Sequence, residues 1–152
     1  MTRNEKIGEN MTRYPYIANR KMTVKDAFSF MKECDIRHLP VIQDGRIVGV
    51  VSDRDLRQAM AFTGPGEILV EDVMVNNPYR VKMGTPLAKV AQVMAENRYG
   101  CTLIENEKGH VVGIFTTTDG MRLLANLLNK ADESGAKVYE IDYETFPEYL
   151  SV

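Results

Sequence analysis

The sequence predicts a mixed α/β (α+β) fold of two pseudo-symmetric βαββα repeats that pack through their small sheets. The first observation is an internal repeat, because Pro15–Val41 and Pro78–Ile104 align at an offset of 63 residues (78 − 15) with their apolar positions in register. The second is that Gly49–Asp55 aligns with Gly113–Asp119 when one more residue is allowed. Since duplicated small units bury a shared core, we expect two modules related by a pseudo-two-fold axis.

The first repeat begins with a short strand over 16–18 and a helix that starts at Thr23. Thr23 can act as the N-cap, and Asp26 stands in the capping-box position three residues later. Apolar side chains recur along this helix at a spacing that buries one face, at Val24, Ala27, Phe28 and Met31. Cys34 and Asp35 are expected to end it.

A hairpin and a second helix complete the first repeat. The strands are expected over 39–42 and 47–51, and Asp44-Gly45 between them is a strong signal for a two-residue turn. The second helix is expected to begin at Ser52 and to end before Gly64-Pro65-Gly66, which breaks it.

The second repeat predicts the same order of elements. After a strand over 79–81, Thr85 is expected to cap a helix in which Pro86 takes the first helical position. A hairpin follows over 101–115, and Thr116 opens the last helix. The expected buried face of the first helix consists of Leu87, Val90, Ala91 and Met94, and the last helix carries Met121, Leu124, Leu127 and Leu128.

Shifts in composition divide the chain into five segments. Residues 1–10 are predicted to be a polar N-terminal extension, flexible or lightly docked, before the first repeat at 11–63. A linker over 64–72 is short enough to keep the second repeat, 73–130, in contact with the first. Residues 131–152 carry six carboxylates and several aromatic rings, and we expect this acidic tail to pack partly on its own chain or on a neighbour.

Composition and charge exclude several function classes. The 152 residues are 44% hydrophobic and 26% charged, with a net charge of −2, so a nucleic-acid partner is not expected. The sequence has no run of about 20 apolar residues to span a membrane, and its first ten residues lack the apolar stretch of a secretory signal. Cys34 and Cys101 do not suggest a disulfide framework. We therefore expect a cytoplasmic protein.

Two short polar motifs occupy equivalent places in the two repeats. Ser52-x-x-Asp55 and Thr116-x-x-Asp119 each follow a strand that contains glycine. Either motif is explained by helix capping alone. However, a helix N-terminus also suits a phosphate, and a carboxylate suits the two hydroxyls of a ribose because it only accepts hydrogen bonds. The matched pair therefore favours two ligand sites.

Taken together, the motifs resemble the tandem CBS-domain pair, or Bateman module. The matching segments are Met11-Thr12 with Pro15, Arg37-His38-Leu39-Pro40-Val41 and Gly49–Asp55 in the first repeat, and Val73-Met74, Pro78 and Gly113–Asp119 in the second. The resemblance spans residues 11 to about 130. It implies a regulatory module that binds AMP, ADP, ATP or S-adenosylmethionine in clefts between the repeats and signals through conformation or partner binding.

The same resemblance implies roles for individual residues. Ser52 and Thr116 would meet the phosphate, and Asp55 and Asp119 would hold the ribose hydroxyls. The adenine pocket would be lined, largely by backbone groups, by Arg37, His38, Leu39 and Pro40.

The second repeat departs from this pattern at its adenine segment. Leu103 stands where Pro40 stands in the first repeat. Two unequal clefts are therefore expected, with the one around Ser52 and Asp55 the better site for a nucleotide.

Two arginines near Ser52 have alternative interpretations. Arg54 and Arg57 lie in the first turns of the helix, where a cation is unfavourable beside the positive end of the helix dipole. Arg54 is retained as a candidate phosphate ligand because a guanidinium fork matches phosphate oxygens. A solvated surface position is the alternative for at least one of the two.

Catalytic and metal sites are not expected. His38, Ser52 and Asp55 could suggest a triad, but no nucleophile-elbow pattern surrounds Ser52 and capping already accounts for the serine and the aspartate. The two histidines and two cysteines have no metal-ligand spacing. We expect no tightly bound cofactor, only a regulatory adenosine ligand.

The alternative function is a ligand-free interaction or scaffold protein that oligomerises through its helices. The apolar stripes over 24–31 and 87–94 were expected to be available for partners, which makes a homodimer the default assembly. An unidentified effector protein would receive the signal, because the predicted repeats include no effector domain.

Overall fold

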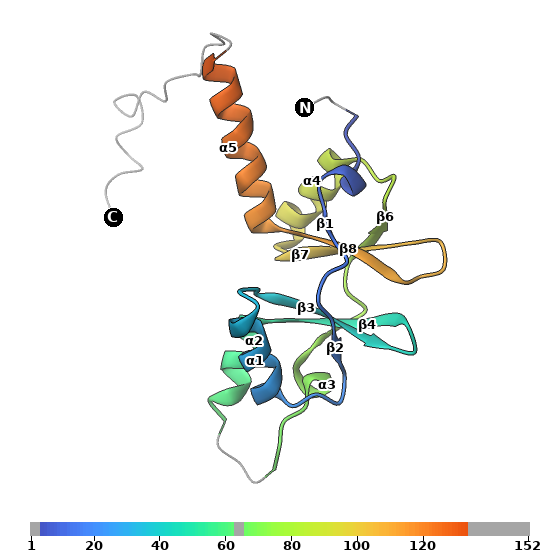
Figure 1. Ribbon diagram of the computed structural model, residues 1–152, viewed down its shortest axis with the longest axis vertical. Helices are drawn as coiled ribbons and strands as arrows, with labels where there is room; N and C mark the ends of the chain where they lie inside the picture. The colour runs from blue at the N-terminus through green and yellow to red at the C-terminus, as the bar shows by residue number, and fades with distance from the viewer. Residues whose placement is uncertain (1–3, 63–65, 134–152) are drawn as a thin grey trace, which may run out of the picture. The chain divides into compact units, whose positions relative to one another are not determined.

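Two four-stranded sheets carry the fold of residues 1–120 (Figure 1). The computed structural model describes residues 4–62 and 66–133, and it confirms the mixed α and β architecture with two small sheets. A second unit, residues 121–152, contains most of the last helix. The two units are described separately below.

The first sheet has the strand order β2-β3-β4-β5. Its strands are β2 (Ala18–Asn19), β3 (His38–Gln43), β4 (Arg46–Ser52) and β5 (Val75–Asn76), and its helices are α1 (Val24–Glu33), α2 (Asp53–Met60) and the short α3 (Val70–Val73). Strands β3 and β4 form the predicted hairpin, with Asp44 and Gly45 both at positive φ in its turn. Helices α1 and α2 lie on one face of this sheet (Figure 1).

The second sheet has the order β1-β8-β7-β6. Its strands are β1 (Thr12–Arg13), β6 (Arg80–Lys82), β7 (Cys101–Glu105) and β8 (Val111–Thr116). The same unit contains the 3-10 helix η1 (Ile7–Glu9) and α4 (Leu87–Asn97), and α5 (Thr117–Glu133) begins directly after β8. Each repeat thus contains the predicted strand, helix, hairpin and helix in order.

Each sheet is completed by a short strand from the other repeat. β1 lies at the start of the first repeat but pairs with β8, aligning Thr12 with Ile114. β5 opens the second half of the chain but pairs with β4, aligning Val50 with Val75. This exchange was not predicted from the sequence, and it links the two repeats through backbone hydrogen bonds.

A methionine beside each exchanged strand covers a glycine of the other repeat. A Cβ atom on Gly49 would lie 2.5 Å from Sδ of Met74, and one on Gly113 would overlap Sδ of Met11. Because Gly49 and Gly113 are equivalent in the repeat, the duplication has preserved this contact twice. The missing side chain is what lets each methionine approach the strand.

The duplication also preserves unusual backbone conformations. Tyr14 and Asn77, equivalent positions that each precede a proline, have φ of 50° and 49°. Asp35 and Arg98, which follow α1 and α4, have φ of 51° and 56°. Since few residues with a side chain adopt positive φ, these matched turns support a real structural repeat.

The two repeats meet through their sheets, as predicted. Ile47 of β4 packs in one apolar cluster with residues of the second repeat, namely Cys101, Leu103 and Ile114. A separate core lies between the first sheet and its helices and includes Ala27, Met31, Leu39, Val41, Val51 and Leu56. The opposite faces of β3 and β4 therefore pack into the two clusters.

The N-terminal segment is docked more firmly than expected. Ile7, in the region predicted to be a polar extension, is completely buried. Its backbone N–H donates to the carbonyl of Thr85, and the N–H of Leu87 donates to the carbonyl of Glu5. One apolar side chain and these backbone contacts hold residues 5–8 against the start of α4.

This docking corrects the predicted start of α4. The helix begins at Leu87, and Pro86 is its N-cap residue instead of its first helical residue; Thr85 does not cap it. The carbonyl of Glu5 accepts the first helical N–H, so the second repeat needs no side-chain cap there.

Three further expectations are corrected. Ala91, predicted to lie in the buried face of α4, is exposed. The stripes expected to be free for partners are instead buried within the chain through Val24, Ala27 and Met31 and through Leu87, Val90 and Met94. The segment predicted as a linker contains α3, whose Val70 is completely buried, because its backbone is fastened to the start of α1.

In the second unit, residues 121–133 continue α5. Their four exposed large apolar side chains are Met121, Leu124, Leu127 and Leu128. The predicted acidic tail lies almost entirely outside the described residues. Among the described helices, none is long and apolar enough to cross a membrane.

Candidate functional site

The first motif forms a complete capping box at the junction of β4 and α2. Oγ of Ser52 accepts a hydrogen bond from the backbone N–H of Asp55 at 3.1 Å. Oδ2 of Asp55 accepts one from the backbone N–H of Ser52 at 2.9 Å. These two bonds fix both side chains at the N-terminus of the helix, with both residues half-buried.

The second motif has the same geometry at the junction of β8 and α5. Oδ2 of Asp119 accepts from the backbone N–H of Thr116 at 2.8 Å, and Oγ1 of Thr116 accepts from the N–H of Asp119 at 3.2 Å. The hydroxyl of Thr116 also lies 2.9 Å from Oδ2 of Asp119, to which it can donate. This third contact comes in addition to the two hydrogen bonds that both motifs share.

The surrounding backbone is duplicated as well. The N–H of Asp53 donates to the carbonyl of Arg37 at 2.9 Å, and the N–H of Thr117 donates to that of Gly100 at 3.0 Å. His38 is paired with Ser52 across the first hairpin, and Cys101 with Thr116 across the second. Each motif therefore lies beside the start of the preceding strand, where the adenine segment was predicted.

His38 brings the two motifs into one electrostatic environment. Its ring lies against Gly100, since a Cβ atom on that glycine would be 2.9 Å from Nε2 of His38. Burial lowers the pKa of His38, and Arg37 adds to this effect. Asp53, Asp55 and Asp119 oppose it by raising the pKa of the imidazole. The imidazole thus senses carboxylates of both motifs.

The four residues of the predicted adenine segment differ in exposure. Arg37 is exposed and His38 is half-buried, whereas Leu39 and Pro40 are buried. The side chain of Leu39 belongs to the core beneath α1 and α2. This side chain is therefore unavailable to a ligand, and the backbone role that the resemblance implies for Leu39 stays a prediction.

The structure separates the two arginines of α2. Arg57 lies 3.8 Å from Asp53 and 5.6 Å from the centre of the Phe28 ring, so it packs on α1. Arg54 is exposed and remains a candidate for binding phosphate. Lys21, a weaker basic candidate, is paired with Glu71.

The second repeat differs where Leu39 of the first repeat is replaced by Thr102. Thr102 is fully buried, and its hydroxyl is the one buried side-chain oxygen or nitrogen in the described part of the chain that lacks a hydrogen-bond partner. Burial also raises the pKa of the neighbouring Cys101 thiol to about 12. This thiol is therefore protonated at neutral pH and unsuited to nucleophilic or metal chemistry.

Sequence reasoning missed two features of this region. The contact of His38 with Gly100 joins opposite repeats, and no local pattern signals it. The buried hydroxyl of Thr102 had a signal, because the repeat alignment places it opposite Leu39, an apolar core residue. Within the described residues no cluster of histidine, cysteine and carboxylate side chains could hold a metal ion.

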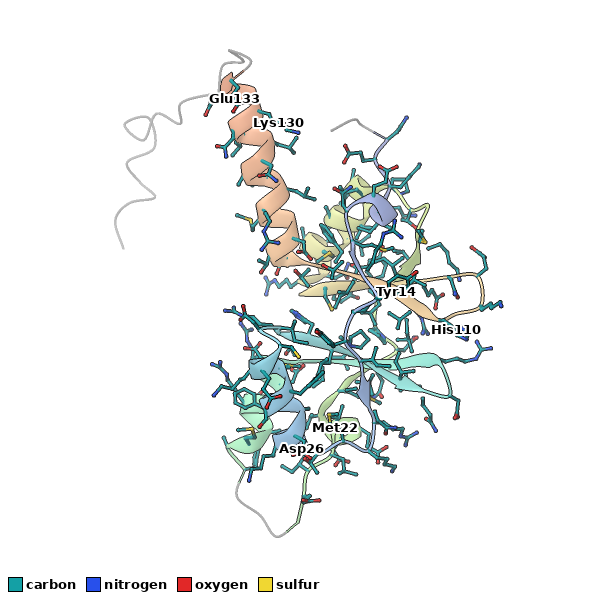
Figure 2. All side chains as sticks on the ribbon, viewed as in Figure 1. Tyr14, Met22, Asp26, His110, Lys130 and Glu133 are labelled. Carbon is teal, nitrogen blue, oxygen red and sulfur yellow. The ribbon has the colours of Figure 1, made fainter. Side chains whose placement is uncertain are left out.

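A cavity elsewhere in the first repeat is separate from both motifs. It has a volume of about 410 Å³ and lies where α1 begins and α2 ends, near Asp26 (Figure 2). Its lining includes Thr23, Asp26, Ala59 and Phe62. It contains none of the predicted ligand-binding residues, so it is a competing place for a small molecule.

Comparisons of sequence and of structure with known proteins point to the same family. A family model for the CBS domain matches residues 5–62 and 70–126. The crystal structure of a putative acetoin utilization protein (AcuB) from Vibrio cholerae is 30% identical with a TM-score of 0.77, covering 85% of this chain and 98% of that one. The CBSX2 structure in complex with AMP is 26% identical with a TM-score of 0.69, covering 80% and 97%.

The match to a longer curated protein is partial. The uncharacterized protein MJ1225 of Methanocaldococcus jannaschii is 28% identical over 134 residues, which is 80% of this chain. The chain spans 48% of that relative, about half of its length.

Proposed function

This chain belongs to the CBS-domain family, and we propose that it is a non-catalytic regulatory module that binds an adenosine-containing ligand beside Ser52–Asp55 and Thr116–Asp119. The ligand class is AMP, ADP, ATP or S-adenosylmethionine. The observation that carries the proposal is the pair of equivalent capping boxes, whose carboxylates both act on His38. The AMP complex of CBSX2 supports it.

The first motif offers the groups that a nucleotide needs. The N-terminus of α2 presents backbone N–H groups and the positive end of a helix dipole, which suit a phosphate. Asp55 uses Oδ2 to cap the helix, and its carboxylate retains acceptor capacity for the hydroxyls of a ribose. Arg54, exposed on the same turn, would pair with the phosphate.

We propose the first cleft as the main site. The second motif has its hydroxyl directed to Asp119, and Leu103 replaces Pro40 in its adenine segment. These differences would change both the polar end and the apolar wall of the second cleft. They support unequal affinities of the two clefts for the adenosine ligand.

The output of the module is a change of shape or of partner affinity. A ligand shifts a conformational equilibrium only by its differential affinity for the two states. We propose that the signal passes through a homodimer and an effector protein. The exposed apolar side chains of α5, including Leu124 and Leu128, support self-association, and the particle mass in solution tests it.

A hydrolytic role is disfavoured by the hydrogen bonding. Asp55 accepts from the backbone of Ser52, and Ser52 in turn accepts from the backbone of Asp55. A catalytic serine instead needs a base at its hydroxyl and a carboxylate on that base. The scaffold alternative retains one argument, because both capping boxes are complete without a ligand.

A thermal-shift panel tests the proposal. We expect at least one of the four adenosine ligands to raise the melting temperature by about 5–10 °C, because ligand at about 100 times its Kd adds about 2.7 kcal/mol. Guanosine nucleotides serve as the comparison. A flat response to the whole adenosine panel would favour the scaffold alternative.

Two single-residue variants test which motif binds the ligand. Asp55→Asn and Asp119→Asn should each weaken the response of one cleft. Asp72→Asn is the matched control, because Asp72 also accepts from an N-cap backbone N–H, that of Leu69 at 2.9 Å, but belongs to α3. Equal ligand responses in all three variants would contradict the assigned ribose role.

A further inference from the structure

The ring of His38 occupies a position shared by the two repeats. It extends from the first residue of β3, in register with the N-cap of α2. Its Nε2 atom lies 2.9 Å from the position of a Cβ atom on Gly100, immediately before β7. A residue of the first predicted adenine segment therefore lies against the equivalent segment of the second repeat.

The carboxylates around this ring already make contacts with other groups. Asp55 and Asp119 accept hydrogen bonds from the N-caps of their helices, and Asp53 lies 3.8 Å from Arg57. Arg37 adjoins the imidazole in sequence and opposes its protonation. The carboxylates nearby are thus already engaged, and burial keeps the pKa of the imidazole below its ordinary value.

We propose that His38 makes the cleft selective for anionic adenosine ligands by taking up a proton when a phosphate binds. The inference rests on the proposed function and narrows its ligand class to nucleotides, over neutral nucleosides and the cationic S-adenosylmethionine. It makes His38 a specificity-determining residue. Its backbone would line the adenine pocket, and its side chain would favour a ligand that carries a phosphate.

The physical reason is thermodynamic linkage. A phosphate at the N-terminus of α2 adds negative charge close to a ring that is in register with that helix start, and this favours the imidazolium. The charged ring in turn attracts the phosphate, so an anionic ligand binds more tightly at mildly acidic pH. A neutral nucleoside adds no charge, so its affinity does not increase when the imidazole is protonated.

The shared position extends the effect to both clefts. Because Asp119 of the second motif acts on the same ring as Asp55, a phosphate bound at either motif changes the charge that the other experiences. Occupancy of the two clefts is then coupled through one proton.

The chain has two histidines, which makes the test direct. His110 lies in the turn between β7 and β8 (Figure 2), away from both motifs, so His110→Gln is the matched control for His38→Gln. Magnetic resonance of the two imidazole Cε1–H signals follows each histidine separately. Calorimetry in buffers of different ionisation enthalpy counts the protons taken up on binding.

We expect AMP to raise the titration midpoint of His38 and to bind with more proton uptake than it does in His38→Gln. The affinity for AMP, relative to that variant, should rise by up to about tenfold between about pH 8 and about pH 6, equivalent to about 1.4 kcal/mol. Comparing variants removes the titration of the phosphate of AMP itself. Adenosine should show none of this difference.

A second variant leaves every titratable group in place. Gly100→Ala inserts a methyl group at 2.9 Å from Nε2 and should displace the ring, reducing the proton uptake while the protein stays folded. Inorganic pyrophosphate, as a probe without a nucleoside, should also raise the midpoint of His38.

The outcomes separate this inference from the proposed function. If AMP binds without changing the titration midpoint of His38, and with the same proton uptake in the unmodified protein and in His38→Gln, the inference is wrong and the proposed function stands. If pyrophosphate raises the titration midpoint of His38 but no adenosine ligand binds, His38 still responds to an anion and the proposed function fails. If neither probe has any effect, both are wrong.

Discussion

The half-buried imidazole of His38 should give this protein a pH-dependent stability, in addition to the ligand-dependent charge that we propose. Burial is the largest cause that lowers the pKa of His38 from its ordinary value of 6.5, and three carboxylates oppose it. The ring is therefore harder to protonate in the folded state than in the unfolded chain. Below the ordinary value the unfolded state binds more protons than the folded state, which stabilises the unfolded state and lowers the free energy of unfolding.

From this shift we predict that the free energy of unfolding rises with pH up to about pH 6.5, with no further contribution from His38 above it. His38→Gln should flatten this rise, because glutamine does not titrate. Urea unfolding at about pH 5 and about pH 7 measures the difference. An unchanged slope in the variant would show that His38 does not differ between the two states.

Thr102 is a fully buried polar residue in the central strand β7 of the second repeat. Its hydroxyl is buried without a partner, and a buried polar group without a hydrogen bond costs about 1–3 kcal/mol. We therefore predict that Thr102→Val, which keeps the shape, stabilises the protein by about 1–2 kcal/mol in denaturant unfolding. Thr12→Val, at an exposed strand position, is the control. A loss of stability would instead reveal a partner for the hydroxyl.

At this scale the sequence predicted the residues with local signals. Ser52 and Asp55 lie where a capping motif places them, and Thr116 and Asp119 repeat the geometry. The surroundings of His38 could not be predicted, because Gly100 is distant in sequence and an absent side chain leaves no pattern. Pro86 was misassigned because the group that caps α4 is the backbone carbonyl of Glu5.

Among the elements, the exchanged strands β1 and β5 depend on two glycines. A Cβ atom on Gly49 would lie 2.9 Å from Cγ of Met74 and 3.0 Å from the carbonyl of Val75, and Gly113 has the equivalent contact with Met11. The strands are two residues each, so this packing adds to a small number of backbone hydrogen bonds.

We predict that Gly49→Ala and Gly113→Ala each destabilise the fold by about 1–3 kcal/mol through overpacking. Gly84→Ala is the matched control, since nothing lies within 4 Å of its Cβ position, and it should be neutral or slightly stabilising. Pairing Gly49→Ala with Met74→Ala should recover part of the loss. Additive effects of that pair would contradict the proposed contact.

The helices and hairpins could be predicted because their signals are local. The periodicity of α1, the turn at Asp44-Gly45 and the caps at Thr23 and Ser52 all follow from neighbouring residues. Short strands such as β1 and β5 have no alternation to detect. Exposure also follows from three-dimensional packing, which is why Ala91 lies outside the core despite its helical spacing.

For the whole molecule, duplication determines the architecture. Two equivalent repeats place two capping boxes around the same imidazole. The sequence predicted both repeats, and the inequality of the two clefts, based on Leu103, stays a prediction. The sequence did not predict the exchange of strands, through which the repeats are joined by backbone as well as by the cluster at Ile47.

The most direct measurement of the central claim is the map of amide resonance changes when AMP is added to isotopically labelled protein. The account predicts the largest changes at the backbone of 37–40 and 52–55, with weaker changes at 116–119. Changes concentrated instead at 23–26 and 59–62, around the cavity of about 410 Å³, would contradict the proposed site, and no change at all would contradict adenosine-ligand binding itself.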